Sequence, residues 1–383
     1  MPTPYVFKTT LVFLFLLLQS LLLQAQGHVD PHQYDSKISS LLKKGQEEIA
    51  IYYLNKKTLL AKKTDSLALW GQTQVDIIDI IESDYKRSLA HMDAAWVNRW
   101  REPKTEEEWR PFMLVFTNKG YFLKELGQYW QANQAYETAA KYYERFQYLG
   151  FDVVYAIYKP LGSNYIRLGE NDKAIAVFQK ALAHGPNNED LSGLYSNIGS
   201  AYWNKGDYLI AEENYRKGLG LSDISDAKKG LLLGRLAETM LDLGRTAEAA
   251  RTATKALRLL HPEGPDDTEI FEYRARARRI AGLANTKLLK FAEAQRFIAG
   301  ALADDRVSSG DTSREVGKDY IAFSKLYLRQ GRILPALGAA DKALSAVIPS
   351  FHPGPANPHI PKSPNPQINQ FYEENTIFEA LTA

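Results

Sequence analysis

The segment SNIGSAYWNKGDYLIAEENYRKGL, from Ser196 to Leu219, combines small and large aromatic residues in a pattern that decides the fold. Gly199 is followed by Tyr202 three residues later and by Ala211 twelve residues later. This spacing fits neither the alternation of a strand nor one amphipathic helix. Two helical patterns joined by a turn at Gly206 account for it, because glycine adopts the left-handed backbone that ends a helix.

The same pattern recurs along the chain. The small residue of the first helical pattern comes back at separations of 42, 37, 38, 45 and 42 residues, as Gly120, Gly162, Gly199, Ala237, Gly282 and Ser324. Because the small and large residues of these units recur in the same register, they favour a repeat array over an ordinary helical bundle with accidental glycine and alanine spacing. Gly162 and Gly199 are expected to face Ala174 and Ala211 of the second helix. A glycine within a helix costs about 1 kcal/mol relative to alanine, so close packing has to recover that loss.

These units resemble tetratricopeptide repeats, and the resemblance covers residues 111–348. It implies an all-α protein, a right-handed superhelix or α-solenoid built from six antiparallel helix pairs. Residues 26–110 carry apolar residues at intervals of three and four and are expected to form degenerate repeats that cap the array. Their buried stripes are predicted at Leu67, Trp70, Ile77, Ile81, Leu89 and Trp96.

Both ends of the chain differ in composition. Residues 1–25 contain one basic residue, Lys8, an apolar stretch and a small residue at Ala25, and predict a secretory signal peptide. The alternative is an uncleaved anchor, but Gln19 and Ser20 interrupt a stretch shorter than the ~20 apolar residues of a membrane span. Cleavage predicts an exported protein, periplasmic or extracellular, without a membrane span.

Residues 349–383 are predicted to form a proline-rich linker and a short tail. The order of export signal, repeat array, proline-rich linker and FYEENTIFEAL resembles the region that precedes a CHAT domain in bacterial proteins. CHAT peptidases are caspase-like and use a His/Cys pair. This chain contains no cysteine, so the resemblance transfers no enzymatic function.

Catalytic and metal-binding patterns are absent from the sequence. Seven histidines form no HExxH or Cys/His pattern, and there is no nucleophile elbow, phosphate loop or dinucleotide fingerprint. We therefore expect no enzyme, no cofactor and no metal site; a copper or nickel site at a Gln26-Gly27-His28 terminus is a minor alternative, since glutamine tends to cyclise. The formal charge of +2 argues against a nucleic-acid surface.

Two charged motifs stand out: KTEEEW at 104–109 and YRARARR at 273–279. In a helix, Arg274 and Arg278 share one face, while Arg276 and Arg279 share another. A solvated helix surface is the preferred interpretation, and a docking patch is the alternative.

The concave face, lined by the first helix of each pair, is the predicted binding groove. Positions near the small residue of the first helix should point into it: Asn118, Tyr121, Lys159, Ser163, Asn197, Ser200, Trp203 and Asn204. In similar repeats an asparagine at the position of Asn118 and Asn197 bonds the backbone of a bound peptide, since an amide both donates and accepts. Units four to six lack this asparagine and have Arg235, Ile280 and Ala322 at the same position.

The sequence thus predicts a non-catalytic scaffold that binds a protein or peptide partner in this groove. Two alternatives stay open. The chain could be the sensor part of a truncated CHAT-type peptidase, or an assembly element for self-association. The oligomeric state is not determined by the sequence.

Overall fold

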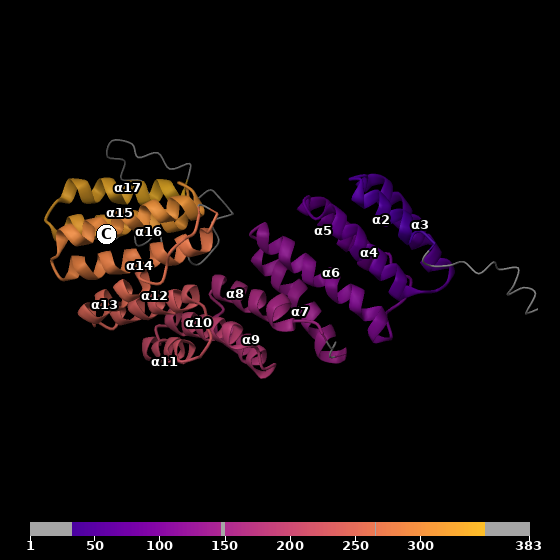
Figure 1. Ribbon diagram of the computed structural model, residues 1–383, viewed down its shortest axis with the longest axis horizontal. Coiled ribbons are helices and arrows are strands. Elements are labelled where there is room, and N and C mark those ends of the chain that lie inside the picture. Colours follow the sequence, from indigo (N-terminus) through magenta and orange to yellow (C-terminus); the bar gives the residue numbers. More distant parts are fainter. Residues whose placement is uncertain (1–32, 147–149, 265, 349–383) are drawn as a thin grey trace, which may run out of the picture. The chain divides into compact units, whose positions relative to one another are not determined.

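The computed structural model describes residues 33–146, 150–264 and 266–348, and in these ranges the chain forms helices joined by turns, with no β-strand (Figure 1). The predicted all-α class is confirmed for this part of the chain. The predicted signal peptide (residues 1–25) and the predicted linker and tail (residues 349–383) lie outside the described residues.

The helices follow one another as pairs. Two pairs come first: α2 (Asp35–Lys43) with α3 (Glu47–Lys63), and α4 (Leu67–Ile81) with α5 (Tyr85–Val97). The next pairs match the predicted repeat units: α6 (Glu106–Glu125) with α7 (Tyr129–Phe146), α8 (Lys159–Arg167) with α9 (Asn171–Ala183), α10 (Asn188–Asn204) with α11 (Tyr208–Leu219), α12 (Asp226–Asp242) with α13 (Thr246–Leu257), α14 (Thr268–Lys287) with α15 (Phe291–Ser309), and α16 (Arg314–Arg329) with α17 (Ile333–Val347). A short π-helix, η1 (Val154–Tyr158), leads directly into α8.

Contacts divide the chain into two compact units. The first consists of residues up to 126 together with 135–151, and the second of residues 127–134 and those from 152 onward. Pro111, where the sequence places the start of the array, lies inside α6. That helix begins earlier because the hydroxyl of Thr105 accepts a hydrogen bond from the N–H of Glu108 and caps it.

The first unit is held by a core that the sequence predicts in large part. Leu67, Trp70, Ile77 and Ile81 are buried, while Leu89 and Trp96 are partly buried at the edges of two apolar clusters. In one of these clusters Trp70 and Trp96 pack against Phe112 of α6. The N-terminal pairs therefore bury apolar stripes in the way that repeat units do.

The turn between the two helices of a pair uses a left-handed residue. Seven residues after each small residue the backbone φ is positive: 73° at Gly127, 75° at Gly169, 83° at Gly206, 77° at Gly244, 59° at Leu289 and 74° at Gly331. These values confirm the predicted role of the turn glycines. The fifth unit departs from the others, because a leucine adopts this conformation there.

The glycines within helices make room for aromatic rings of the second helix. A Cβ on Gly199 would lie 2.5 Å from the ring of Tyr215, and one on Gly162 would lie 2.5 Å from the ring of Phe178. The nearest groups are therefore aromatic rings four residues beyond Ala211 and Ala174, on the same helices as these alanines. Both alanines are fully buried, so the close approach of the two helices is confirmed.

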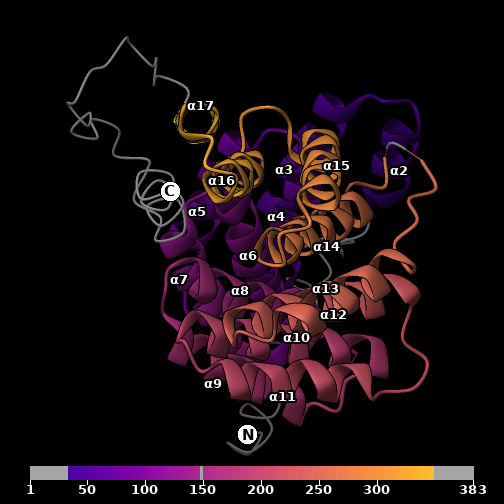
Figure 2. The same cartoon turned by 90° about the vertical axis from the view of Figure 1, so that its left-hand side faces the viewer.

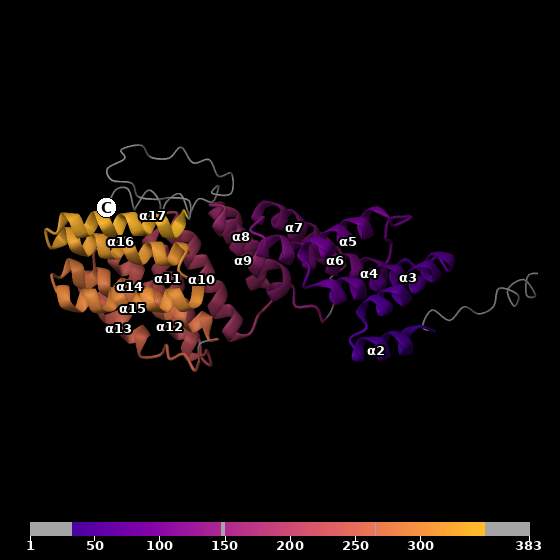
Figure 3. The same cartoon turned by 90° about the horizontal axis from the view of Figure 1, so that it is seen from above.

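In the second unit the pairs are stacked in chain order. Figures 2 and 3 show them following one another, with α16 and α17 as the last pair. The first helices α8, α10, α12, α14 and α16 each contact the next one in this series. This arrangement brings side chains from five repeats onto one surface.

Candidate functional site

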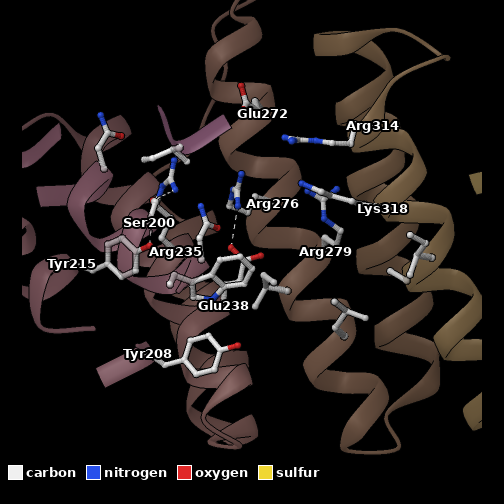
Figure 4. A pocket seen from close by; sticks show the side chains of 18 of the residues that line it. Ser200, Tyr208, Tyr215, Arg235, Glu238, Glu272, Arg276, Arg279, Arg314 and Lys318 are labelled. Carbon is white, nitrogen blue, oxygen red and sulfur yellow. Dashed lines mark hydrogen bonds and ion pairs between the residues drawn. The ribbon is translucent and has the colours of Figure 1, made fainter. Parts of the chain in front are cut away.

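The first helices of the second unit line an open cavity of about 520 Å³. Its lining comes from α8, α10, α12, α14 and α16, with Tyr208 and Tyr215 added from α11 (Figure 4). No other second helix contributes. The cavity therefore lies on the face formed by the first helices, where the sequence places the binding groove.

One side of the cavity carries amide, hydroxyl and aromatic groups on α8 and α10. The Trp203 indole donates to the Asp242 carboxylate of α12 at 2.8 Å, and the Asn204 amide donates to Asn171 at 3.2 Å. The Ser200 hydroxyl donates to the Ser196 carbonyl at 2.8 Å. These bonds fix the side chains at the rim of the cavity before any ligand arrives.

The other side is formed by charged groups of α12, α14 and α16. Arg276 of α14 donates to Glu238 of α12 at 3.0 Å, and Lys318 of α16 donates to Glu315 of the same helix at 3.0 Å. Arg276 and Lys318 outweigh the effect of burial and hold the pKa of Glu238 below its ordinary value. Figure 4 shows Arg314 and Lys318 pointing from α16 toward α14.

A buried ion network lies behind this wall. The Arg279 guanidinium donates to Asp305 and Asp319 at 2.8 Å each and to Glu315 at 2.9 Å. Burial and the neighbouring Asp305 carboxylate raise the pKa of Asp319 to about 8. Burial also raises the pKa of Asp305. Two carboxylates on one guanidinium therefore favour holding a single proton between them.

The network corrects the interpretation of YRARARR as a solvated surface. Arg279 is 6% exposed. Arg274 and Arg278 both donate to Asp304 of α15, at 2.6 Å. The two predicted faces exist, but Arg274 and Arg278 bind α15, while Arg276 and Arg279 reach α12, α15 and α16. Arginine is suited to such sites because its planar guanidinium bonds several carboxylates at once.

Five of the eight predicted groove residues line the cavity: Ser163, Asn197, Ser200, Trp203 and Asn204. The other three do not. Lys159 donates to Asp190 of α10 at 2.9 Å. Asn118 and Tyr121 lie on α6, which belongs to the first unit.

Most charged residues of the cavity were missed by the sequence analysis, although the repeat register contains the signal for several of them. The position one residue after the small residue lines the cavity in five units, as Ser163, Ser200, Glu238, Leu283 and Lys325. The position of Asn197 does so again as Arg235, Ile280 and Ala322. Applying the predicted register to units four to six would have found these residues.

No group of three His, Cys, Asp or Glu side chains suited to a metal ion occurs among the described residues. Within the same part of the chain, no helix is both long and apolar enough to span a bilayer.

Two of the repeats match a known protein family. A family model described as tetratricopeptide repeat matches residues 161–183 and 192–223, which fall on α8–α9 and α10–α11. No curated protein matches the sequence.

Solved structures extend the comparison to the fold. The apo form of the quorum sensor NprR from B. thuringiensis is 15% identical, covers 89% of this chain and 94% of its own, and has a TM-score of 0.52. A tetratricopeptide repeat protein from Parabacteroides merdae is 17% identical, covers 86% and 98%, and has a TM-score of 0.48. A chain of the APC/C hetero-tetramer is 15% identical over 88% of this chain, with a TM-score of 0.47, and this protein spans 60% of that chain's length.

Residues 161–183 and 192–223 therefore match the tetratricopeptide-repeat family. The chain's likeness to NprR shows an all-helical solenoid fold, and at this level of identity it shows the fold alone.

Proposed function

We propose that this protein is a non-catalytic scaffold that binds a peptide or an extended segment of a partner protein in the cavity of its second unit. The observation that carries the proposal is the lining of that cavity, to which the first helices of five consecutive repeats contribute. A volume of about 520 Å³ falls in the range of ligand pockets. An extended peptide suits a surface built from stacked repeats.

The chemistry of the cavity fits a peptide. Asn197 and Asn204 carry amides, which pair with the N–H and C=O groups of a peptide backbone. Trp203 and Tyr208 offer aromatic surface, and Leu283 offers an aliphatic one. Aromatic side chains with a fixed orientation are the usual anchors of such interfaces.

A selection experiment with two matched tryptophan variants tests this function. Peptides of eight residues displayed on phage are selected on the immobilised full chain, and the Kd of enriched peptides is measured by fluorescence anisotropy. We expect Trp203→Ala to weaken binding about tenfold or more, as for a hot-spot tryptophan. Trp130→Ala is the control, since Trp130 is 59% exposed and lies outside the cavity lining; it should leave the Kd unchanged.

Two outcomes would overturn the proposal: no enriched peptide, or equal effects of the two tryptophan variants. Asn197→Ala gives a second measurement at the cavity in case Trp203→Ala loosens the contact with Asp242. Circular dichroism melting verifies that each variant is folded.

The remaining predictions from the sequence are part of the same proposal. We propose that the protein is exported, and mass spectrometry of the chain recovered from its own cell would show a terminus at residue 26. The proposed relation to CHAT-type proteins concerns residues 349–383. It is tested by reading the gene sequence downstream of residue 383, where a His/Cys pair would support the relation.

Light scattering of the purified protein tests self-association.

A further inference from the structure

The wall of the cavity formed by α12, α14 and α16 is strongly basic. Among all lining residues, seven are Arg or Lys and two are Glu, a formal excess of five positive charges. In formal charge, the three carboxylates that hold Arg279 from behind reduce this excess to two, and the proton shared by Asp305 and Asp319 adds one positive charge to it. The whole chain carries a formal +2, so a charge of at least the same size is concentrated at one cavity.

The cations of this wall act on one another. Burial, together with the charges of Arg314, Arg279 and Arg276, lowers the pKa of Lys318 to about 8, although Glu315 opposes the shift. The Lys318 and Arg314 side chains are 30% and 27% exposed, and partial burial strengthens such repulsion. An anion that enters the cavity would relieve it.

Arg235 supplies a second and independent observation. Its guanidinium donates to the Ser200 hydroxyl, a neutral acceptor. Its Nε is buried without a hydrogen-bond partner. Among the described residues, no ion pair is formed by Arg235, whereas Arg276 pairs with Glu238 at 3.0 Å. A buried donor without an acceptor is costly, and a carboxylate is the acceptor that a guanidinium prefers.

We propose that the basic wall, defined by Arg235, Arg276, Arg314 and Lys318, receives the carboxylate side chain of an acidic peptide. This inference rests on the proposed function and names the class of partner. The apolar residues beside the wall, Ile280, Leu283 and Ile321, favour apolar neighbours of the acidic residue in the peptide.

Charge distribution favours a peptide over a nucleic acid. Nucleic-acid surfaces present a basic stripe that follows a phosphate backbone. Here the excess charge lies inside a cavity that also contains Glu238 and Glu272 and is bordered by amides and apolar groups. Glu238 and Glu272 would repel the successive phosphates of a nucleic acid. A peptide with one carboxylate can place that group on the arginines and away from the two glutamates.

The experiment compares two peptide pools on the full chain. The pools are fluorescein-labelled random octapeptides that differ only at one fixed position, glutamate in one pool and glutamine in the other. We expect the glutamate pool to bind about tenfold more tightly, since a hydrogen bond to a charged group is stronger than one to a neutral group. Arg235→Gln and Arg314→Gln should remove most of that difference, and raised salt should reduce it.

A matched control comes from the same helix as Arg276. Arg278 points to the opposite face and donates to Asp304, which keeps its bond to Arg274 at 2.6 Å when Arg278 is replaced. Arg278→Gln should therefore leave both pools unchanged, and Arg235→Lys should restore part of the preference for glutamate.

The outcomes separate this inference from the proposed function. Equal binding of the two pools, with the Trp203 effect retained, overturns the acidic partner and leaves peptide binding in place. Loss of glutamate preference in Arg278→Gln as well overturns the assignment to this wall. Tighter binding of an eight-nucleotide oligothymidine than of the glutamate pool overturns the peptide class. Absence of any peptide binding overturns both proposals.

Discussion

At the scale of single residues, glycines inside one helix differ in what surrounds them. Gly199 is enclosed, because its missing Cβ leaves room for the ring of Tyr215. Gly193, six residues earlier in α10, is open: a Cβ there would meet only the Lys228 Nζ, at 4.0 Å. Substitution by alanine should therefore change the free energy of unfolding in opposite directions at the two positions.

We expect Gly199→Ala to lower the free energy of unfolding by about 1–2 kcal/mol, because overpacking exceeds the gain in helix propensity. Gly193→Ala should raise it by about 0.5–1 kcal/mol. Urea denaturation followed by circular dichroism measures both. Stabilisation by both variants would show that the contact with Tyr215 relaxes without cost.

The left-handed turn residues give a second pair of variants. Leu289 has a φ of 59° and is 56% exposed, and a non-glycine residue pays about 1–2 kcal/mol for that conformation. Leu289→Gly should therefore raise the free energy of unfolding by about 0.5–1 kcal/mol once the entropy of the unfolded glycine is subtracted. Leu288→Gly, at a φ of −83°, should lower it. The same denaturation experiment measures both variants. A lower free energy of unfolding in both would contradict backbone strain at Leu289.

At the scale of elements, one guanidinium of α14 bonds to both α15 and α16. Arg279 joins Asp305 of α15 to Asp319 and Glu315 of α16. Removing one partner of a buried ion pair typically costs about 3–5 kcal/mol. The YRARARR motif is thus a structural junction between the fifth and sixth repeats, and two of its arginines, Arg276 and Arg279, also border the cavity.

This junction should make stability depend on pH. The pKa of Asp319 is raised to about 8, so the folded state holds a proton that the unfolded chain releases near pH 4. The favourable contribution is complete below pH 4 and is lost as the pH rises toward 8. Its slope is at most about 1.4 kcal/mol per pH unit for one proton. The pKa of Glu315 is held well below its usual value, so Glu315 stays ionised in this window.

Asp319→Asn tests the pH dependence, because asparagine resembles the protonated acid and does not titrate. Urea denaturation at pH 5, 6.5 and 8 should show that the free energy of unfolding of the parent falls as the pH rises. The free energy of unfolding of the variant should fall less. Asp311→Asn is the control, since Asp311 pairs with Arg306 at the surface with its side chain 80% exposed. An unchanged slope in Asp319→Asn would show that the shared proton is elsewhere.

At the scale of the whole molecule, stacking of repeats turns scattered residues into one site. Lys318 faces Arg314 and Glu315 of its own helix, Arg276 and Arg279 of α14, and Glu238 of α12. No single repeat contains this set. Binding at the cavity should therefore respond to changes in several repeats at once.

The titration of Lys318 gives a prediction for binding. Because the pKa of Lys318 is about 8 in the folded protein, its ammonium is lost between pH 7 and 9. The affinity for the glutamate pool should fall over that range, by about tenfold if the ammonium contributes one charge-assisted bond. Binding of the glutamine pool should change little. Lys318→Gln should flatten the profile, and an unchanged profile in this variant would exclude Lys318 as the titrating group.

Sequence reasoning went far on the fold because repeats are local. The spacing from Gly199 to Gly206 and Ala211 fixes a helix, a turn and a second helix within about 25 residues, and the register then repeats. It also placed Ser163, Asn197, Ser200, Trp203 and Asn204 on the face that lines the cavity. Asn118, Tyr121 and Lys159 do not line the cavity, because spacing alone does not tell which side chains a neighbouring helix engages.

The charges were decided by the tertiary structure. Asp305 and Asp319 stand 26 and 40 residues after Arg279, and nothing in local spacing marks them as its partners. Whether an arginine on a helix is solvated or buried depends on what the neighbouring helices bring to it. The sequence by itself therefore determined a solenoid with a lined inner face, while only the stacking of its repeats decided that this face carries a basic cavity.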